Sequence, residues 1–285
     1  MTAPPVFQDA PPARPTAPVS VVIPCFRCGR TIGRALASAA GQSLRPAEVI
    51  LVDDCSGDGT LETLKQLAAH HGADWIRILA LPGNVGLASV RNRGWEASTQ
   101  AYVAFLDDDD AWHPDKIRIQ YSYMERHPEI DFSGHNHRIL GAPEPPPNVA
   151  EAPPAHRIGA LELLLANRFI APSVMVKRDL PLRFEEGRRH MEDHLLWLQL
   201  VLRGFRADRI EAELADIYKA SFGEGGLSAQ MLPMARADLR NYQVLRAAGL
   251  LPAAAAYLLY AFSIAKTVRR FLLLGLRLLR RRLVP

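Results

Sequence analysis

The stretch Ala101-Tyr-Val-Ala-Phe-Leu106, followed directly by Asp107-Asp-Asp-Asp110, decides how this chain folds. The six residues before the aspartates have the apolar character of a strand buried in a sheet. Four adjacent carboxylates repel one another, and a strand has no need of them. At a sheet edge they offer hard oxygen ligands, which suit Mg²⁺ or Mn²⁺ and hence a phosphorylated substrate. A solvated acidic turn is the alternative, but the stiff, apolar Trp112-His-Pro114 that follows argues against it.

Upstream of the aspartates, strands and helices alternate along the chain. Strands are predicted over residues 19–23, 47–52, 75–79 and 101–106, and helices over residues 31–40, 60–70 and from the turn at 84–86 to 97. This alternation indicates right-handed crossovers and an α/β fold, with a mostly parallel sheet flanked by helices. Ligands bind at the carboxyl ends of such strands. Pro24, Asp53-Asp54 and the aspartate run all fall there, so we expect them to converge in space.

The second half of the chain is less regular. The expected elements are helices over residues 115–126, 158–167 and 191–202, an extended segment from 130, a proline-rich loop over 141–155 and a strand over 173–177. Residues 1–18 are rich in Pro and Ala, which predicts disorder.

The composition limits the possible classes of protein. The 285 residues, 48% hydrophobic and 22% charged, allow one large domain or two modest ones and exclude wholesale disorder. The N-terminus has neither a basic start nor an apolar run, so no secretory signal is expected. Three cysteines, an odd number, argue against a disulfide framework and for a reducing compartment.

Positive charge is concentrated near the C-terminus. Nine of the 34 cations lie from Leu239 onward, where there is no acid, and the rest of the chain carries 25 cations against 30 acids. A nucleic-acid-binding body is disfavoured, because such a body would carry the positive charge itself. A basic tail aimed at anionic lipid is favoured instead.

Taken together, several motifs resemble those of family 2 glycosyltransferases with the GT-A fold. In chain order they are Val19-Ser-Val-Val-Ile-Pro24, Val52-Asp-Asp-Cys-Ser-Gly-Asp-Gly-Thr60, Asn84-Val-Gly86 with Arg91-Asn92, Phe105-Leu-Asp-Asp-Asp-Asp-Ala-Trp-His-Pro114, and Glu192-Asp193 with Leu196-Trp197. The resemblance implies an inverting, metal-dependent transferase that uses a nucleotide-activated sugar, often UDP-linked. It divides the chain into a disordered start (1–18), a GT-A domain (19–230) with a nucleotide half (19–114) and an acceptor half (115–230), and a helical tail (231–285).

The same resemblance implies a nucleotide pocket at the ends of the first strands. Asp54 would contact the base, and Pro24 and Phe26 would line the pocket. Arg91 would face the nucleotide or its diphosphate, and a plain surface cation is the equally weighted alternative. The family's usual Thr-Tyr-Asn is here Cys25-Phe-Arg27, so Phe26 can stack on a base but lacks a hydroxyl.

Roles for the acidic residues also follow from the resemblance. Asp109 would be the ligand of Mn²⁺ or Mg²⁺, with Asp107 directed towards the ribose or the metal. Asp108 falls on the nucleotide side, where the family usually has a small residue, and would be the most solvated of the four, while Asp110 would support them. Asp193 matches the family's catalytic base. In isolation, Asp193 would be taken for a first-turn acid that complements a helix dipole.

Sugar transfer needs two separate acidic groups whatever the family. Negative charge builds on the departing diphosphate, and a divalent cation held by carboxylates stabilises it. The acceptor hydroxyl loses a proton as it attacks, so a carboxylate near its oxygen serves as base. The aspartate run and Asp193 supply these two groups.

Other motifs leave alternatives open. Cys25-Phe-Arg-Cys28 has the spacing of a zinc or redox pair, but no second cysteine pair exists to complete a zinc site. His135 and His137 alternate as on a strand, which indicates partly buried or surface histidines, or a role near the acceptor. Lys219–Ser228 resembles the loop that closes over the donor in this family, and an ordinary connector is the alternative. The lid residues would be Gly223, Gly225, Gly226 and Ser228.

The C-terminal residues have the pattern of a basic amphipathic helix. Cations gather within about 60° of Lys266, and apolar side chains occupy the other side. The uncharged stretch 247–265 before it is borderline for a membrane span. We expect the tail to lie in a membrane interface with its arginines at anionic headgroups. Packing on its own domain or on a partner subunit is the alternative.

These patterns predict a glycosyltransferase that is peripheral on the cytoplasmic, inner face of the cell membrane. It would transfer a sugar from a nucleotide-sugar donor to a lipid-linked or polysaccharide acceptor with inversion. One alternative is a nucleotidyltransferase, which would need a glycine-rich loop with Lys or Arg after the first strand. The other is a non-catalytic nucleotide-sugar-binding scaffold, against which the carboxylate of Asp193 argues.

Overall fold

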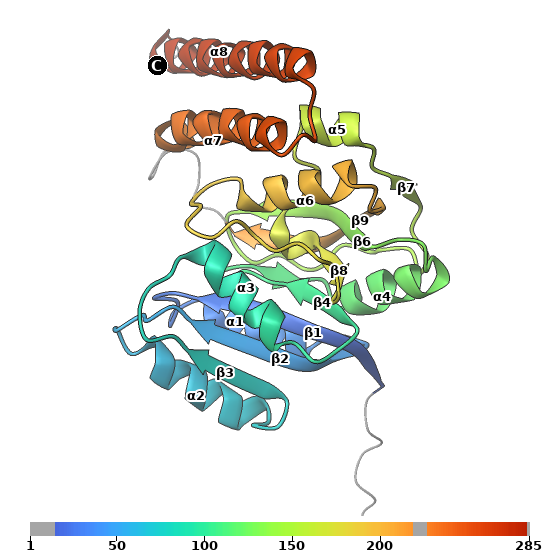
Figure 1. Ribbon diagram of the computed structural model, residues 1–285. Coiled ribbons are helices and arrows are strands. Elements are labelled where there is room, and N and C mark those ends of the chain that lie inside the picture. The colour runs from blue at the N-terminus through green and yellow to red at the C-terminus, as the bar shows by residue number, and fades with distance from the viewer. Residues whose placement is uncertain (1–14, 219–226, 284–285) are drawn as a thin grey trace, which may run out of the picture.

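The computed structural model describes residues 15–218 and 227–283, and Figure 1 shows their arrangement. Within these residues, a nine-stranded sheet runs in the order β3-β2-β1-β4-β8-β6-β9-β5, with β7 paired to β9 beside this path. The strands are β1 (Thr16–Cys25), β2 (Arg45–Asp53), β3 (Ile76–Ala80), β4 (Tyr102–Phe105), β5 (Ala111–Trp112), β6 (Phe132–Leu140), β7 (Ala155–Arg157), β8 (Met175–Lys177) and β9 (Ala207–Tyr218). The helices are α1 (Ile32–Ala40), α2 (Thr60–His71), α3 (Leu87–Ala97), α4 (Lys116–Arg126), α5 (Ala160–Leu165), α6 (Glu192–Leu202), α7 (Leu227–Ala247) and α8 (Ala253–Leu283), with a 3₁₀ turn at Ala171–Ser173.

The first four strands form the parallel half of the sheet, as the sequence predicted. β1 lies between β2 and β4, β3 lies outside β2, and all four run in the same direction. Cys25 pairs with Asp53, Asp53 pairs with Ala80, and the amide of Leu106 donates to the carbonyl of Val22. β1, β2 and β3 therefore end level with one another, β4 ends opposite Val22, and the segments that follow the strands meet along one edge.

Beyond β4 the sheet becomes mixed. β8 runs antiparallel to β4 and to β6, β6 runs parallel to β9, and β5 and β7 run antiparallel to β9. The two-residue strand β5 comes directly after the aspartate run and pairs near the end of β9. This pairing brings Tyr218 back to the aspartates, and its amide donates to Asp110 over 3.1 Å.

Helices cover both faces of the sheet. Buried side chains of α1, α2 and α4 pack with Val21 and Ile23 on one face. Side chains of α3, α5, α6, α7 and α8 pack with Val22 and Phe105 on the other. On this second face Gly94 of α3 has no room for a side chain, because a Cβ there would clash with Val22. This close approach seats α3, and with it Arg91, against the ends of β1 and β4.

The start of the chain corrects one expectation. β1 begins at Thr16, so the last residues of the segment 1–18, predicted to be disordered, belong to a strand. Residues 1–14 lie outside the described part of the chain.

Helices α7 and α8 form a hairpin stacked beyond α6, with α8 outermost (Figure 1). Tyr242 and Leu245 of α7 are fully buried, and Ala256 and Leu259 of α8 join the same core. Residues 253–265 of the uncharged stretch thus form one continuous helix with the basic segment, and the first half of this helix packs on its own domain. In the part of the chain that the structure describes, no helix combines the length and apolarity needed to cross a bilayer.

The orientation of α8 differs from the sequence expectation. Lys266, the centre of the predicted cationic face, lies 3.0 Å from a carboxylate oxygen of Asp238 on α7. Ser263, one turn earlier, donates to the same carboxylate. Lys266 therefore points at the domain, whereas Arg269 and Arg270 of the predicted cationic face are exposed, as are apolar side chains on the other side of α8.

Candidate active site

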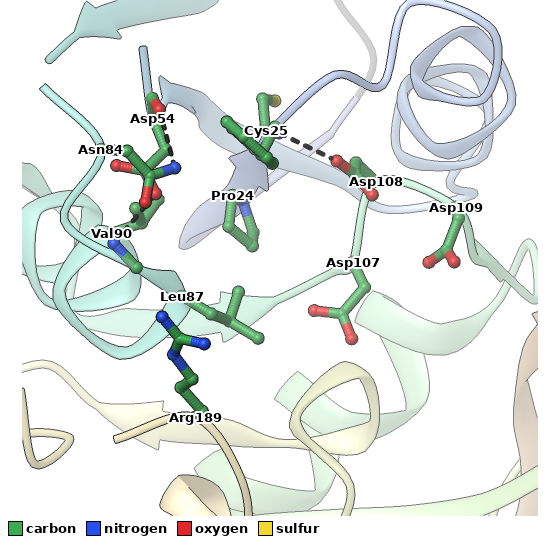
Figure 2. A pocket seen from close by; sticks show the side chains of 12 residues that line it. Pro24, Cys25, Asp54, Asn84, Leu87, Val90, Asp107, Asp108, Asp109 and Arg189 are labelled. Atoms are coloured by element: carbon green, nitrogen blue, oxygen red, sulfur yellow. Dashed lines mark hydrogen bonds between the residues drawn. The ribbon is translucent and has the colours of Figure 1, made fainter. Parts of the chain in front are cut away.

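Two adjoining cavities open at the carboxyl edge of the parallel strands. The first, here the strand-edge cavity, measures about 430 Å³ and follows the ends of β1, β2 and β4 (Figure 2). The second, here the α6 cavity, measures about 440 Å³ and extends to the first turn of α6. Leu87, Asp107, Asp109 and Arg189 line both cavities, so the two spaces form one site.

The structure brings together the residues that the sequence singled out. Of the proposed nucleotide contacts and metal ligands, those that line the strand-edge cavity are Pro24, Phe26, Asp54, Asp107, Asp108 and Asp109. Arg91 and Asp193 line the α6 cavity, where they meet Asp107 and Asp109. The convergence expected from strand ends is therefore present, whereas the role of each residue stays a prediction.

The four aspartates relieve their mutual repulsion by turning in different directions. Asp107 accepts a hydrogen bond from Arg91 over 2.7 Å, and Asp110 is buried and accepts from the amide of Tyr218. In Figure 2 the carboxylates of Asp107 and Asp109 point into the cavity, and Asp108 turns towards the β1 end. Asp110 thus has the supporting place that the sequence predicted.

Asp108 is not the most solvated of the four, which corrects the sequence expectation. Its carboxylate accepts from the amide of Phe26 over 3.3 Å, and burial raises the pKa of Asp108 to about 6. Asp109 is instead the exposed member of the run. Asp108 therefore fastens the segment after β1 to the segment after β4, which fixes the wall of the strand-edge cavity.

Arg91 is a buried link between three parts of the site, and the alternative of a plain surface cation is wrong. Its side chain on α3 bridges Asp107 after β4, at 2.7 Å, and Glu192 at the start of α6, at 2.9 Å. Burial disfavours the charged guanidinium, but Asp107 and Glu192 outweigh it and hold the pKa of Arg91 above its ordinary value. Arg91 therefore couples the position of Asp107 to that of α6.

Asp54 holds the turn that begins α3. Its two carboxylate oxygens accept from the amides of Val85, at 2.7 Å, and Gly86, at 3.0 Å, and the Asn84 amide donates to its carbonyl. Gly86 has a φ of 85°, which only glycine adopts without strain. Asp54 thus shapes one end of the strand-edge cavity, and its contact with a base stays a prediction.

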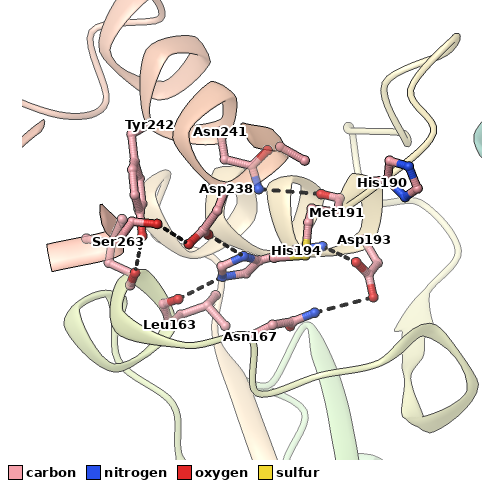
Figure 3. Close-up of polar contacts among 12 residues, drawn as sticks. Leu163, Asn167, His190, Met191, Asp193, His194, Asp238, Asn241, Tyr242 and Ser263 are labelled. Carbon is pink, nitrogen blue, oxygen red and sulfur yellow. Dashed lines mark hydrogen bonds and ion pairs between the residues drawn. The ribbon is translucent and has the colours of Figure 1, made fainter. Parts of the chain in front are cut away.

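Asp193 stands in the wall of the α6 cavity at the first turn of α6 (Figure 3). One carboxylate oxygen accepts from the amide of His194 over 2.6 Å, and the other is 3.4 Å from the amide nitrogen of Asn167. Burial raises the pKa of Asp193 to about 6, Glu192 adds to this rise, and Arg91 opposes it. An acid that merely complements a helix dipole would have a lowered pKa, so the surroundings favour a carboxylate that can take up a proton.

The backbone is strained at three loops that surround the site. Arg27 after β1, Cys55 after β2 and Met191 before α6 are the non-glycine residues with positive φ within the described ranges, at 54°, 57° and 58°. Such conformations persist where the surrounding structure enforces them, and they are concentrated at functional sites. Their placement agrees with a site at this edge of the sheet.

Of the cysteine and histidine motifs, only Cys25 lines one of the two cavities. Cys25 and Cys28 are both buried free thiols, and burial raises the pKa of Cys25. His135 is fully buried in the second half of the sheet and accordingly has a lowered pKa. Of the predicted lid, Gly223, Gly225 and Gly226 lie outside the described residues, and Ser228 belongs to α7 instead of to a loop.

The residues present fit a divalent cation that arrives with its substrate. Among the described residues no group of three or more His, Cys, Asp or Glu side chains forms a ready-made cage. Asp107 and Asp109 nevertheless direct their carboxylates into the same cavity (Figure 2). Mg²⁺ commonly takes one or two protein carboxylates and completes its shell with substrate phosphates and water. This donor set therefore suits Mg²⁺ or Mn²⁺ bound together with a diphosphate.

Arg189 is a site residue that the sequence analysis missed. It is exposed, lines both cavities, and points towards the strand-edge cavity in Figure 2. The signal was present in the run Arg188-Arg189-His190, one residue before Glu192-Asp193. Such a run on a loop is common, so only its placement beside the aspartates indicates an anionic ligand.

Comparison with known proteins agrees with this geometry. Residues 20–178 match the family described as Glycosyl transferase family 2. The chain is 32% identical over 203 residues to the "Putative teichuronic acid biosynthesis glycosyltransferase TuaG" of Bacillus subtilis (strain 168), covering 70% of this chain and 77% of that one. It is 28% identical over 202 residues to the "UDP-Glc:alpha-D-GlcNAc-diphosphoundecaprenol beta-1,3-glucosyltransferase WfaP" of Escherichia coli, covering 70% and 76%.

A solved structure shares the fold. S. aureus TarS 1-349 in complex with UDP-GlcNAc superposes with a TM-score of 0.66, at 18% identity, over 86% of this chain and 71% of that chain. The GT-A fold that the motifs implied is therefore confirmed.

Proposed function

The chain belongs to glycosyl transferase family 2, and we propose that it transfers a sugar from a UDP-sugar to a lipid-linked acceptor with inversion. One observation carries the proposal. The strand-edge cavity and the α6 cavity share Asp107 and Asp109, and Asp193 stands in the wall of the second. A donor with its nucleotide in the first cavity would place its diphosphate at the shared aspartates and its sugar facing Asp193.

The donor half of the proposal concerns the strand-edge cavity. The ring of Phe26 is 45% exposed at the cavity, so it is available to stack on a base, with Asp54 and Pro24 beside it. The choice of uridine is supported by the relatives, because WfaP by its name uses UDP-Glc and TarS was solved with UDP-GlcNAc.

Asp107 and Asp109 would hold Mg²⁺ or Mn²⁺ on the diphosphate. When bound, the cation would offset the negative charge that develops on the departing nucleotide diphosphate. The protein's own task is to hold the two carboxylates in place. Arg91 orients Asp107 through their 2.7 Å contact, and the buried Asp110 anchors the run to the end of β9.

Asp193 would act as the base in the α6 cavity. Its carboxylate would accept the proton of the acceptor hydroxyl while that oxygen attacks the anomeric carbon and the diphosphate departs. A single displacement of this kind inverts the configuration at that carbon. A pKa of about 6 leaves Asp193 largely ionised at neutral pH and still a stronger base than an ordinary carboxylate.

The alternatives drawn from the sequence lose their support. A nucleotidyltransferase would use the loop after β1 to cradle phosphates, but Arg27 in that loop is engaged with Ser56 and lies 5.1 Å from the ring centre of Phe26. A non-catalytic scaffold is disfavoured because the family's members are glycosyltransferases.

We also propose that the outer face of α8 lies on the inner, anionic surface of the cell membrane. Its exposed apolar side chains include Tyr257, Leu258 and Leu272. Arg269 and Arg270 follow on the same helix, and the sequence adds four further arginines before its end. An apolar face flanked by arginines is typical of helices that lie in an anionic interface.

A thermal-shift panel of nucleotide sugars, each with and without Mn²⁺, tests the proposed function. At a hundred times its Kd, a true donor adds about 2.7 kcal/mol of stability, which raises the Tm by about 5 °C. We expect this shift for a UDP-sugar with Mn²⁺ and a smaller one without the cation. A panel in which no nucleotide sugar shifts the Tm would contradict the proposal.

A further inference from the structure

A third cavity, here the arginine groove, opens between the loop before α6 and the side of α7. It measures about 400 Å³, and its lining contains four arginines, one histidine and no acid. The lining residues are Gly187, Arg188, Arg189, His190, Pro233, Arg236, Ala237 and Arg240. Such a concentration of one sign of charge in a concave space attracts an anion.

Internal bonds fix the walls of this groove. Arg188 is buried and binds Glu185, the side chain of Asn241 and the carbonyl of Ala237, so it ties the loop to α7. Its charge is thereby matched by Glu185.

The other three arginines of the groove are exposed to solvent. Arg189, Arg236 and Arg240 have no ion pair with any carboxylate among residues 15–218 and 227–283. Arg236 and Arg240 are also spaced i,i+4 on α7, where like charges destabilise a helix. Packing of α7 gives no reason for this arrangement, whereas a multiply charged anion would stabilise it.

The groove shares lining residues with two other spaces of different chemistry. Arg189 and His190 also line the α6 cavity, which contains Asp193. Arg236 also lines a fourth cavity of about 190 Å³ between α7 and α8. The walls of that cavity are mainly apolar and include Leu232, Leu239, Ile264 and Val268.

We propose that the arginine groove binds the diphosphate of an acceptor in which a sugar is joined to a polyprenyl lipid. The acceptor sugar would lie at Asp193, its diphosphate between Arg236 and Arg240, and the start of its lipid chain in the apolar space between α7 and α8. This inference rests on the proposed function, because it assigns the acceptor of the same site. A phospholipid headgroup would match the charge, but it would have no need of a groove that shares Arg189 and His190 with the α6 cavity.

The proposal is tested by calorimetric titration of the full chain with farnesyl diphosphate, with UDP and Mn²⁺ present to fill the donor site. Farnesol and inorganic pyrophosphate serve as probes of the lipid and of the anion alone. We expect farnesyl diphosphate to bind at least tenfold more tightly than either. The double variant Arg236→Ser/Arg240→Ser should weaken its binding tenfold or more. Arg246→Ser, another exposed arginine of α7, is the matched control and should leave it unchanged.

Unchanged affinity in the double variant would overturn the assignment of the groove. The assignment would also be overturned if the double variant bound farnesyl diphosphate normally but no longer bound phosphatidylglycerol vesicles, because the groove would then be a site for lipid headgroups. UDP is titrated separately into each protein. A wild-type protein that binds UDP but not farnesyl diphosphate refutes this inference alone, and one that fails to bind UDP refutes the proposed function.

Discussion

Arg91 is the residue at which the donor and acceptor sides of the site meet. Its guanidinium joins Asp107 to Glu192, and Glu192 is the neighbour of Asp193. Removing one partner of a buried ion pair leaves an uncompensated charge and commonly costs about 3–5 kcal/mol. A site arranged around such a link keeps the diphosphate carboxylates and the base in a fixed relation.

The pH dependence of turnover should report Asp193. As a base it must be ionised, so the rate should rise with pH through about 6 and fall roughly tenfold per unit below that value. Glu192→Gln removes the negative charge that helps to raise this pKa, so the acidic limb should move to lower pH. The measurement is UDP release across pH at saturating donor and acceptor.

Glu186→Gln is the matched control for this profile. Glu186 is half exposed, and its ion pair with Arg93 is long, at 3.9 Å, so its loss should have little effect. The acidic limb of the Glu186→Gln pH–rate profile should lie at the same pH as that of the wild type. A limb that does not move in Glu192→Gln would show that another group is the base.

At the scale of single residues, the sequence predicted which acidic side chains gather at the site but not which contacts each of them makes. Asp107 and Asp109 could be named because they follow the end of a strand, and Asp193 because it matches the family's motif. The contacts of Asp108 with Phe26, and of Arg91 with Glu192, join positions 82 and 101 residues apart. Spacing along one chain cannot show such pairs, because they depend on the tertiary approach of loops.

At the scale of elements, the seating of α3 on β1 sets where Arg91 and the Asn84–Gly86 turn lie. Gly94 permits this contact because its missing side chain leaves room for Val22. Gly94→Ala should therefore push α3 from the sheet and destabilise the protein by about 1–3 kcal/mol. Urea unfolding followed by circular dichroism measures the change.

Gly33→Ala provides the control within a helix. An added Cβ at Gly33 of α1 meets no atom within 4 Å, so this variant should be neutral or gain up to about 1 kcal/mol from helix propensity. Equal stability of the two alanine variants would mean that α3 can shift freely, and the account of its seating would be wrong.

Local patterns predicted the elements better than their pairing. The alternation of strands and helices predicted β1 to β4 and their parallel direction, and β2 pairs with its neighbours in the chain, β1 and β3. It did not show that β4 pairs with β1. The second half pairs β4 with β8 and β6 with β9, which are distant in sequence. Nothing in the residues of β8 or β9 encodes the neighbour that each one finds.

At the scale of the whole molecule, Asp238 of α7 fastens α8 to α7, and the hairpin packs on the domain through buried side chains such as Tyr242 (Figure 3). The carboxylate of Asp238 accepts from Ser263 and Lys266 of α8, and lies 3.9 Å from the ring of the buried His194, next to Asp193. The surface of α8 therefore has a fixed orientation relative to the α6 cavity. A membrane that meets the outer face of α8 would hold a lipid-linked acceptor within reach of the site.

Membrane binding should depend on the outer face of α8. Leu258 and Leu272 are 73% and 64% exposed, so Leu258→Glu/Leu272→Glu should leave the fold intact. If these two leucines are buried in the membrane on binding, their loss should weaken binding to anionic liposomes roughly 100-fold, as measured by co-sedimentation. Leu161→Glu, at a position 69% exposed on α5, should bind as the wild type does. If the double variant sediments like the wild type, α8 is not the contact surface.

The tail also shows where a helical wheel falls short. The pattern indicated an amphipathic helix, but it could not reveal that Asp238 on the neighbouring helix binds Lys266 while Arg269 and Arg270 stay exposed.

Calorimetric titration of UDP in the presence and absence of Mn²⁺ tests the central claim most directly, since it needs no knowledge of the acceptor. We expect Mn²⁺ to strengthen UDP binding to the wild type and to Asp179→Asn, an exposed control aspartate far along the chain from the run. Asp109→Asn should bind UDP at least tenfold more weakly with Mn²⁺ and lose the effect of the cation. Equal, Mn²⁺-dependent UDP binding by wild type and Asp109→Asn would contradict the account.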